Sequence, residues 1–411
     1  MDRLVHEVVR VEGKVGTLMG IVVSCFAKAG GTGISNDLFH TARAAYRTGA
    51  LDAVICYGNR QSEIPANLIR PIRFQPVRMV SFLKARYYYT LKRMALDRRA
   101  ARHIRRHGCD IFHGWTTECL HSLEEAKRIG AKTIVERPAP HPATAWRLLR
   151  EEYERWGVPL PRDDGSRWLA GIDWEHRDVV VAPLEFSLAD RVVVQSEFGL
   201  RSFIEQGFPP GKMVLLPRAV DLKQFPPPSE PEDPKFRVLY VGTVCLRKGF
   251  LDLLHAWTGL GLPGGELWVV GAVHEEIVPF LATCRDDPSI RFFGHVREGA
   301  DRFFPDAAVF VLPSITEGSA KTTYEAMAAG LPVITTLNAG SVVRDGVDGF
   351  IVPIRDPDAI KERLLSLYKN REMGRVLGKS GRDRVAQFSW ETYENRLISI
   401  YGEFLGGSAD A

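Results

Sequence analysis

The sequence predicts an α/β protein of two doubly wound domains, each with a parallel sheet covered by helices on both faces. Three observations predict this. Short apolar runs recur along the chain, helical patterns separate them, and one segment rich in proline and charge divides the series into two. Unalternating apolar runs of this length are typical of parallel strands that are buried on both faces. A chain of 411 residues is also too long for one ordinary core.

The first domain is predicted over residues 1–228, with residues 1–16 as a loose extension because they show no clean period. Its strands are expected at GIVVSC (20–25), AVICYG (53–58), IFHGW (111–115), TIVE (133–136), RVVVQS (191–196) and MVLLP (213–217). The stretch FPPPSEPEDPKF that follows is dense in proline, which removes backbone donors and blocks both helix and central strand. We therefore expect a linker at 229–236.

The second domain is predicted over residues 237–388, with strands at RVLYVG, ELWVVG, IRFFG, AVFVLPS, PVITT and GFIVP. The tail 389–411 is predicted to be helical, because its apolar residues Trp390, Tyr393 and Leu397 lie three or four apart. Two such domains create a cleft between the carboxyl ends of their strands, which is where open α/β sheets bind ligands. The fold narrows function only to nucleotide or phosphate chemistry.

Composition excludes several classes of protein. The net charge of +4 is small for this length, so we expect no nucleic-acid partner. The six cysteines are scattered without a C-x-x-C pair, which fits buried free thiols in a reducing compartment. Nowhere do about 18 apolar residues run together, and the N-terminus does not read as a signal peptide. We therefore expect a cytoplasmic protein.

The strongest candidate site lies at 308–336, where a predicted strand runs through the loop 315–320 into a predicted helix. The backbone amides of residues 318–321 and the positive end of the helix dipole would converge there, which suits an anionic diphosphate. The hydroxyl of Thr322 would add a donor. Glu317 on the loop could accept from sugar hydroxyls, and Glu325 on the helix could accept from a ribose diol. By itself, such a glutamate pair could equally cap a helix and face solvent.

The context of this pair favours a binding site. The stretch SITEGSAKTTYEAMAAGLPVITTLNAGSVVRDGVDGFIVP resembles the signature of glycosyltransferase family 4, whose members have the GT-B fold of two Rossmann-like domains facing each other across a cleft. The segments 191–225 and 241–257, FFGHV (292–296) and FSWETYENRL are similar to further family segments in the same order. The last of these implies that the C-terminal helix at 389–411 packs back on the N-terminal domain. The resemblance covers nearly the whole chain from about residue 20.

The resemblance implies a retaining, metal-independent transferase that moves a hexose-type sugar from a nucleoside-diphosphate donor, with a role in polysaccharide biosynthesis. The acceptor would be a glycan, a lipid-linked molecule or a small molecule, and no cofactor is expected beyond the donor. Glu317, Lys248 and Arg247 are the implied catalytic residues, with the two cations clamping the diphosphate. Donor contacts are implied for Gly242, Val296, Gly318, Ser319, Ala320, Lys321, Thr322 and Glu325.

Two residues of the second domain depart from the family pattern. Thr243 occupies the position where many relatives have an arginine, so whether Arg247 replaces that arginine stays open. Ala320 stands where relatives often have glycine, which restricts positive φ. Arg247 and Lys248 could also be an ordinary solvated helix start. A cation opposes the dipole at a helix N-terminus, which favours a nearby anion.

The first domain offers weaker candidates. Gly31 and Thr32 lie on a glycine-rich loop after the first strand, which could approach donor or acceptor or be a flexible turn. Glu136, Arg137 and His141 follow the strand TIVE, where the family often has a histidine facing the donor sugar; a structural role for His141 is the alternative. No metal site is apparent, since the Asp-x-Asp at 356–358 is expected to start a helix.

The segment 84–107 carries nine lysines or arginines against one aspartate. It is predicted to be a helix with either a solvated basic face or a face that docks peripherally on an anionic membrane surface. Two other functions stay open for the whole chain. A sugar-nucleotide epimerase or hydrolase of the same fold would turn over without an acceptor, and a non-catalytic nucleotide-sugar-binding protein would not turn over at all.

Overall fold

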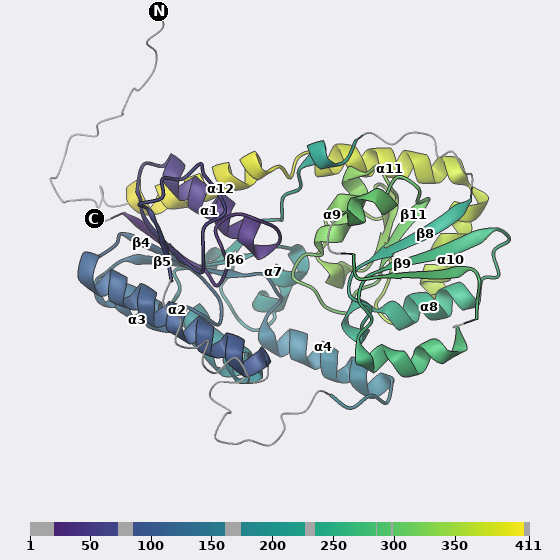
Figure 1. Ribbon diagram of the computed structural model, residues 1–411, viewed down its shortest axis with the longest axis horizontal. Coiled ribbons are helices and arrows are strands. Elements are labelled where there is room, and N and C mark those ends of the chain that lie inside the picture. Colours follow the sequence, from purple (N-terminus) through teal and green to yellow (C-terminus); the bar gives the residue numbers. More distant parts are fainter. Residues whose placement is uncertain are drawn as a thin grey trace, which may run out of the picture.

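The computed structural model describes residues 20–72, 85–160, 174–226, 235–284, 286–296 and 299–406. Within these ranges the chain forms two α/β halves, each built on a twisted parallel sheet (Figure 1). The fold class predicted from the sequence is therefore confirmed. The predicted extension 1–16 and most of the predicted linker 229–236 lie outside the described residues.

The first sheet has the strand order β3-β2-β1-β4-β5-β6-β7, and every described pair in it is parallel. Six of these strands coincide with the predicted apolar runs, whereas the short edge strand β3 was not predicted because it has three residues and ends in Pro71. The strands are β1 Ile21–Ser24, β2 Leu51–Cys56, β3 Ile69–Pro71, β4 Ile111–Trp115, β5 Lys132–Arg137, β6 Arg191–Val194 and β7 Met213–Leu215.

Helices cover both faces of the first sheet and bury an apolar core on each. Helix α1 packs beside the last helix, α12 (Trp390–Gly406). Helix α2 packs beside α3 in the same half of the molecule (Figure 1). The helices of this half are α1 Ile34–Arg47, α2 Ala85–His107, α3 Leu120–Arg128, α4 Pro142–Arg155, α5 Trp174–His176, α6 Ala182–Leu188 and α7 Glu197–Ile204, with a π-helical turn at Arg177–Val181.

The second sheet has the order β10-β9-β8-β11-β12-β13, again parallel, and each of its strands overlaps a predicted run. The strands are β8 Phe236–Val241, β9 Gly265–Val270, β10 Ile290–Gly294, β11 Val309–Leu312, β12 Val333–Thr335 and β13 Gly349–Ile351. The helices of this half are α8 Phe250–Thr258, α9 Lys321–Ala328, α10 Pro357–Lys369 and α11 Arg371–Val385, whereas the last helix, α12 Trp390–Gly406, packs on the first half. Asp356 caps α10 by accepting from the Ala359 amide, so the Asp-x-Asp segment starts a helix.

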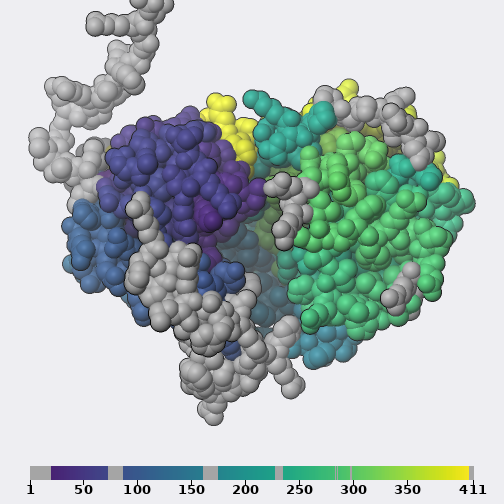
Figure 2. Space-filling view, viewed as in Figure 1, coloured from purple at the N-terminus to yellow at the C-terminus, as the bar shows by residue number. Residues whose placement is uncertain are grey.

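The chain passes between the two halves at neighbouring places. Leu216 belongs to the core of the first half, whereas Val220 and Phe225 belong to the core of the second. The return passage lies beside it, because the Val220 amide donates to the Phe388 carbonyl at 3.0 Å. After this contact α12 runs back along α1, where Tyr393 and Leu397 are buried (Figure 1). A furrow separates the two halves in the space-filling view (Figure 2).

The predicted basic segment forms α2, whose buried face includes Leu96, Ala100 and Ile104. Five of its arginines are exposed, and we call them the α2 arginines: Arg98, Arg99, Arg102, Arg105 and Arg106. All six cysteines are buried free thiols. In the described ranges no helix is both long and apolar enough to cross a membrane.

Candidate active site

The loop between β11 and α9 is held by main-chain bonds to two other loops. The Ile315 amide donates to the Arg247 carbonyl at 2.9 Å, and the Glu317 amide donates to the Asn338 carbonyl at 2.9 Å. The Ala320 amide donates to Ala339, so it is not one of the free amides that the sequence suggested. Ala320 has φ −74°, and alanine therefore fits here without strain. The loop is a fixed scaffold for the side chain of Glu317.

Two glycines permit close approaches that shape the site. A Cβ on Gly318 would lie 2.2 Å from the carbonyl oxygen of Pro138 in the first half, so this loop touches the other domain directly. The Gly318 carbonyl also accepts from the Ser196 hydroxyl at 2.5 Å. Gly249 has φ +65°, and a Cβ there would lie 2.0 Å from the Pro313 carbonyl oxygen. Any side chain at Gly318 or Gly249 would push these segments apart.

The predicted catalytic residues form one ion cluster. The Lys248 ammonium lies 2.6 Å from Glu317 Oε1, and the Arg247 guanidinium also donates to Oε1 and, at 3.3 Å, to the Thr316 carbonyl. Gly242 lies beside this cluster, since a Cβ there would be 3.8 Å from Cε of Lys248. The three charged groups come from loops that follow β8 and β11, which are neighbours in the sheet.

One sequence argument about Lys248 is wrong. Lys248 ends the 3-10 turn Leu246–Lys248, and the left-handed Gly249 separates it from α8, so it does not open the helix. It is also not an unpaired cation, because Glu317 neutralises part of its charge. The local pattern could not reveal this pairing, since Glu317 is far along the chain and reaches Lys248 only through the adjacency of β8 and β11.

Electrostatics keep Glu317 ionised. Its side chain is 14% exposed, and burial alone would raise the pKa of this carboxyl. Lys248 and Arg247 outweigh burial and hold the pKa of Glu317 below its ordinary value. The Lys248 side chain is also mostly covered, with 13% of it exposed, whereas the Arg247 side chain is 41% exposed. Two cations face one carboxylate, so the cluster carries one surplus positive charge.

The start of α9 carries the other predicted donor residues of this loop. Lys321 and Glu325 pair with each other at 2.7 Å within the helix. The Ser319 hydroxyl donates to the Tyr324 hydroxyl at 3.2 Å. Thr322 Oγ1 is buried and has no hydrogen-bond partner among the described residues. A polar ligand at the start of α9 would satisfy this hydroxyl.

The three candidates at the end of β5 and just after it, Glu136, Arg137 and His141, make buried structural contacts. Arg137 is paired with Asp178 and donates to the Pro140 carbonyl at 3.0 Å. Glu136 accepts from the Tyr393 hydroxyl of α12 at 3.2 Å. His141 caps α4 by accepting from the Ala143 amide at 3.2 Å, and burial, with help from Arg137, lowers its pKa to about 4. These side chains are engaged in ion pairs and hydrogen bonds, and among the described residues none of the three contacts the ion cluster.

The remaining candidates lie apart from the cluster. Gly31 and Thr32 are exposed on the loop between β1 and α1. Val296 follows the edge strand β10 and packs against the core of the second half. The structure shows no contact of these three residues with Glu317, Lys248 or Arg247 within the described ranges.

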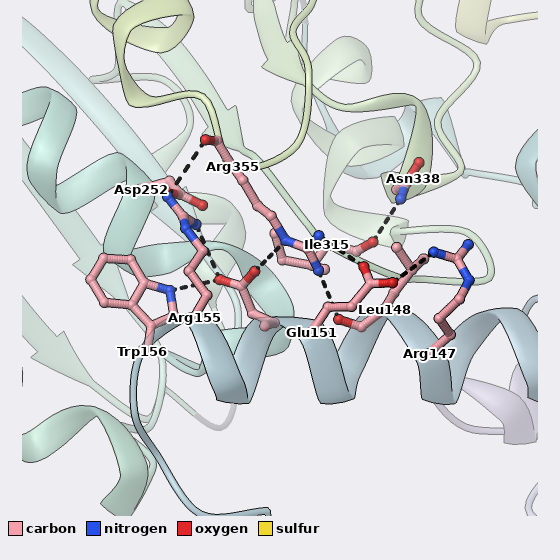
Figure 3. Close-up of polar contacts among 10 residues, drawn as sticks. Arg147, Leu148, Glu151, Arg155, Trp156, Asp252, Ile315, Asn338 and Arg355 are labelled. Carbon is pink, nitrogen blue, oxygen red and sulfur yellow. Dashed lines mark hydrogen bonds and ion pairs between the residues drawn. The ribbon is translucent and has the colours of Figure 1, made fainter.

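Helix α4 is a connection between the halves that sequence reasoning missed. Figure 3 shows it passing beneath the loop of Ile315, with Arg355 reaching down to it from the second half. Arg355 donates to Glu151 at 2.9 Å and to Glu152 at 2.7 Å, and Arg155 pairs with Asp252 at 2.8 Å (Figure 3). Local spacing can indicate a helix but does not say which domain the helix packs on.

The far end of α4 supports the turn that holds Lys248. The Tyr153 hydroxyl donates to Glu276, whose other oxygen accepts from the Leu246 amide at 2.9 Å. Trp156 lies against the rings of His255 and Phe280 in the second half. The first half thus braces the 3-10 turn of the second.

A second missed feature is a pair of charges at the boundary between the halves. Arg218, just before the chain enters the second core, donates to both oxygens of Asp37 at 2.8 and 3.0 Å. Its main chain hydrogen-bonds the Tyr324 hydroxyl on α9. Burial raises the pKa of Asp37 to about 6, although Arg218 and Lys321 both act to lower it. Asp37 and Arg218 are 181 residues apart, so no local pattern signals their pairing.

Comparison with known proteins agrees with this architecture. Residues 235–370 match the family described as Glycosyl transferases group 1. A capsular polysaccharide biosynthesis glycosyltransferase of Staphylococcus aureus, CapM, is 30% identical over 181 residues, which is 41% of this chain and 47% of that protein. The match therefore spans about half the length of that curated relative.

Solved structures match along nearly the whole chain. Sucrose-phosphate synthase from Thermosynechococcus elongatus superposes with a TM-score of 0.66 at 18% identity, covering 95% of this chain and all of that one. The Anabaena protein HepE in complex with UDP gives a TM-score of 0.65 at 14% identity, covering 94% and 100%. The chain has the GT-B fold, and its residues 235–370 are similar to the group 1 glycosyltransferases.

Proposed function

We propose that this protein is a retaining, metal-independent glycosyltransferase that moves a hexose-type sugar from a nucleoside-diphosphate donor to a glycan or lipid-linked acceptor in polysaccharide biosynthesis. The observation that carries the proposal is the cluster of Glu317, Lys248 and Arg247 at the ends of β8 and β11. It lies inside the segment that matches the glycosyltransferase family, and it combines surplus positive charge with an ionised carboxylate.

This cluster has the chemistry that the reaction needs. The diphosphate gains negative charge as the glycosidic bond breaks, and fixed cations stabilise that charge most in the transition state. Lys248 is largely covered, with 13% of its side chain exposed, and is held in place by Glu317, so little reorganisation is needed. The ionised Glu317 can only accept hydrogen bonds, which suits the hydroxyls of the donor sugar. These protein cations would do the work that a divalent ion does in other transferases.

The roles of the neighbouring residues follow from their positions. Thr322 Oγ1, without a partner among the described residues, would donate to a phosphate oxygen. Glu325, 17% exposed on α9, would exchange Lys321 for a ribose diol when the nucleotide binds. Retention is proposed from the resemblance of the Glu317 and Glu325 pair to the family motif. An oxygen of the leaving diphosphate would receive the acceptor proton.

The test is a panel of nucleoside-diphosphate sugars incubated with and without oligosaccharide acceptors. Transfer to an acceptor, with an α-linked product from an α-linked donor in the NMR spectrum, is the expected result. A β-linked product would disprove retention. Donor conversion without acceptor would instead support the epimerase or hydrolase alternative, and binding without any conversion would support a non-catalytic protein.

A further inference from the structure

We propose that Arg218 is the second arginine of the donor site and contacts the donor diphosphate from the side of the first domain. Arg218 lies between Leu216 and Val220, on the segment where the chain passes from the first half to the second, which we call the crossing. The inference rests on the proposed function and concerns the position where relatives have arginine and this chain has Thr243. Arg218 would supply the positive charge that Thr243 does not provide.

The position of Arg218 places it at the start of α9. Its main chain is bonded to the Tyr324 hydroxyl, which in turn accepts from the hydroxyl of Ser319. Ser319 directly follows Gly318 on the loop that carries Glu317. Arg218 is therefore tied by two hydrogen bonds to the loop on which the phosphates are expected. Asp37, its ion-pair partner, lies near enough to Lys321 for the lysine to lower the pKa of that carboxyl.

The guanidinium of Arg218 has unused donors. One terminal nitrogen makes both bonds to Asp37, and the other reaches Gln195 only at 3.5 Å. Its Nε is buried and has no hydrogen-bond partner among the described residues. A buried guanidinium N–H without an acceptor is costly, and an anion beside it would remove that cost.

Arg218 would link donor binding to both halves of the molecule. Arg218 lies two residues before Val220, the first residue of the crossing that is buried in the second core. A diphosphate held by Lys248 on one side and Arg218 on the other would bind both halves at once. Donor binding would thus be linked to the arrangement of the domains by a charged contact at the crossing itself.

The experiment is calorimetric titration of UDP, GDP and ADP, each against its bare nucleoside, for four proteins. These are the unaltered chain, Arg218→Gln, Asp37→Asn and, as a matched surface control, Arg375→Gln on α11. Arg218→Gln should weaken the preferred nucleoside diphosphate about tenfold or more and leave its nucleoside unchanged. Asp37→Asn should keep or strengthen diphosphate binding, because it frees the guanidinium. The control should match the unaltered chain.

A merely structural ion pair gives a different pattern. Both Arg218→Gln and Asp37→Asn would then lower stability together and leave the ratio of diphosphate to nucleoside affinity unchanged, which would overturn the assignment. If Arg218→Gln does not fold, the doubly neutral Asp37→Asn, Arg218→Met variant takes its place, with the same tenfold loss expected. Failure of the unaltered chain to bind any of the three diphosphates would instead count against the proposed function.

Discussion

Replacing Lys248 by alanine removes the ammonium that lies 2.6 Å from Glu317 Oε1. The charge of the cluster then falls from one surplus positive charge to zero, because Arg247 and Glu317 remain as a neutral pair. A single preorganised donor to a developing anion contributes on the order of 3 kcal/mol to the transition state. We therefore expect sugar transfer to slow by about a hundredfold or more.

The assay separates the phosphate contact from a general loss of structure. Calorimetric titration should show weakened binding of the nucleoside diphosphate and nearly unchanged binding of the bare nucleoside, since the cation is not expected to touch the base. Lys379→Ala, an exposed lysine on α11, is the matched control and should behave as the unaltered chain. The variant is expected to fold, because Arg247 still neutralises Glu317.

Two outcomes would refute this reasoning. Equal losses for nucleoside and diphosphate would mean that Lys248 holds the turn and not the ligand. No loss for either would mean that the cluster is a structural ion pair. The double variant Lys248→Ala, Glu317→Gln distinguishes these two outcomes further. If Lys248 and Glu317 form only a structural ion pair, replacing both residues should restore stability and activity together.

Three other predictions follow from the structure. Burial raises the pKa of Glu118 and Glu185 to about 7, so the folded state alone takes up these protons as pH falls from 8 to 6.5. The free energy of unfolding in urea should rise by on the order of 1 kcal/mol per carboxyl over that range, and Glu118→Gln should flatten the slope. Replacing the α2 arginines by glutamine should weaken binding to anionic liposomes at low salt without changing donor affinity; no binding by the unaltered chain would exclude a membrane role. Saturating nucleoside diphosphate should reduce the radius of gyration in solution scattering as the halves close, and an unchanged radius would contradict closure.

The sequence by itself determined the elements and their order. Unalternating apolar runs mark parallel strands because both faces of such strands are buried, and this property is local. The loop after β11 could be identified in the same way, since a strand, a short loop with Glu317 and a helix follow one another directly. The edge strand β3 escaped prediction because three residues ending in proline carry too little periodicity.

Only the tertiary structure decided how the charges are paired. Lys248 meets Glu317 because β8 and β11 are neighbours in the sheet, and Arg218 meets Asp37 because the crossing passes the start of α1. His141 is a helix cap because its ring is buried among Phe186 and Phe203, which lie later in the chain. Partners so far apart leave no periodic trace in a sequence. The interaction energies of these pairs depend on how deeply the groups are buried and how far apart they lie. Burial and distance are set only when the sheets and helices have packed together.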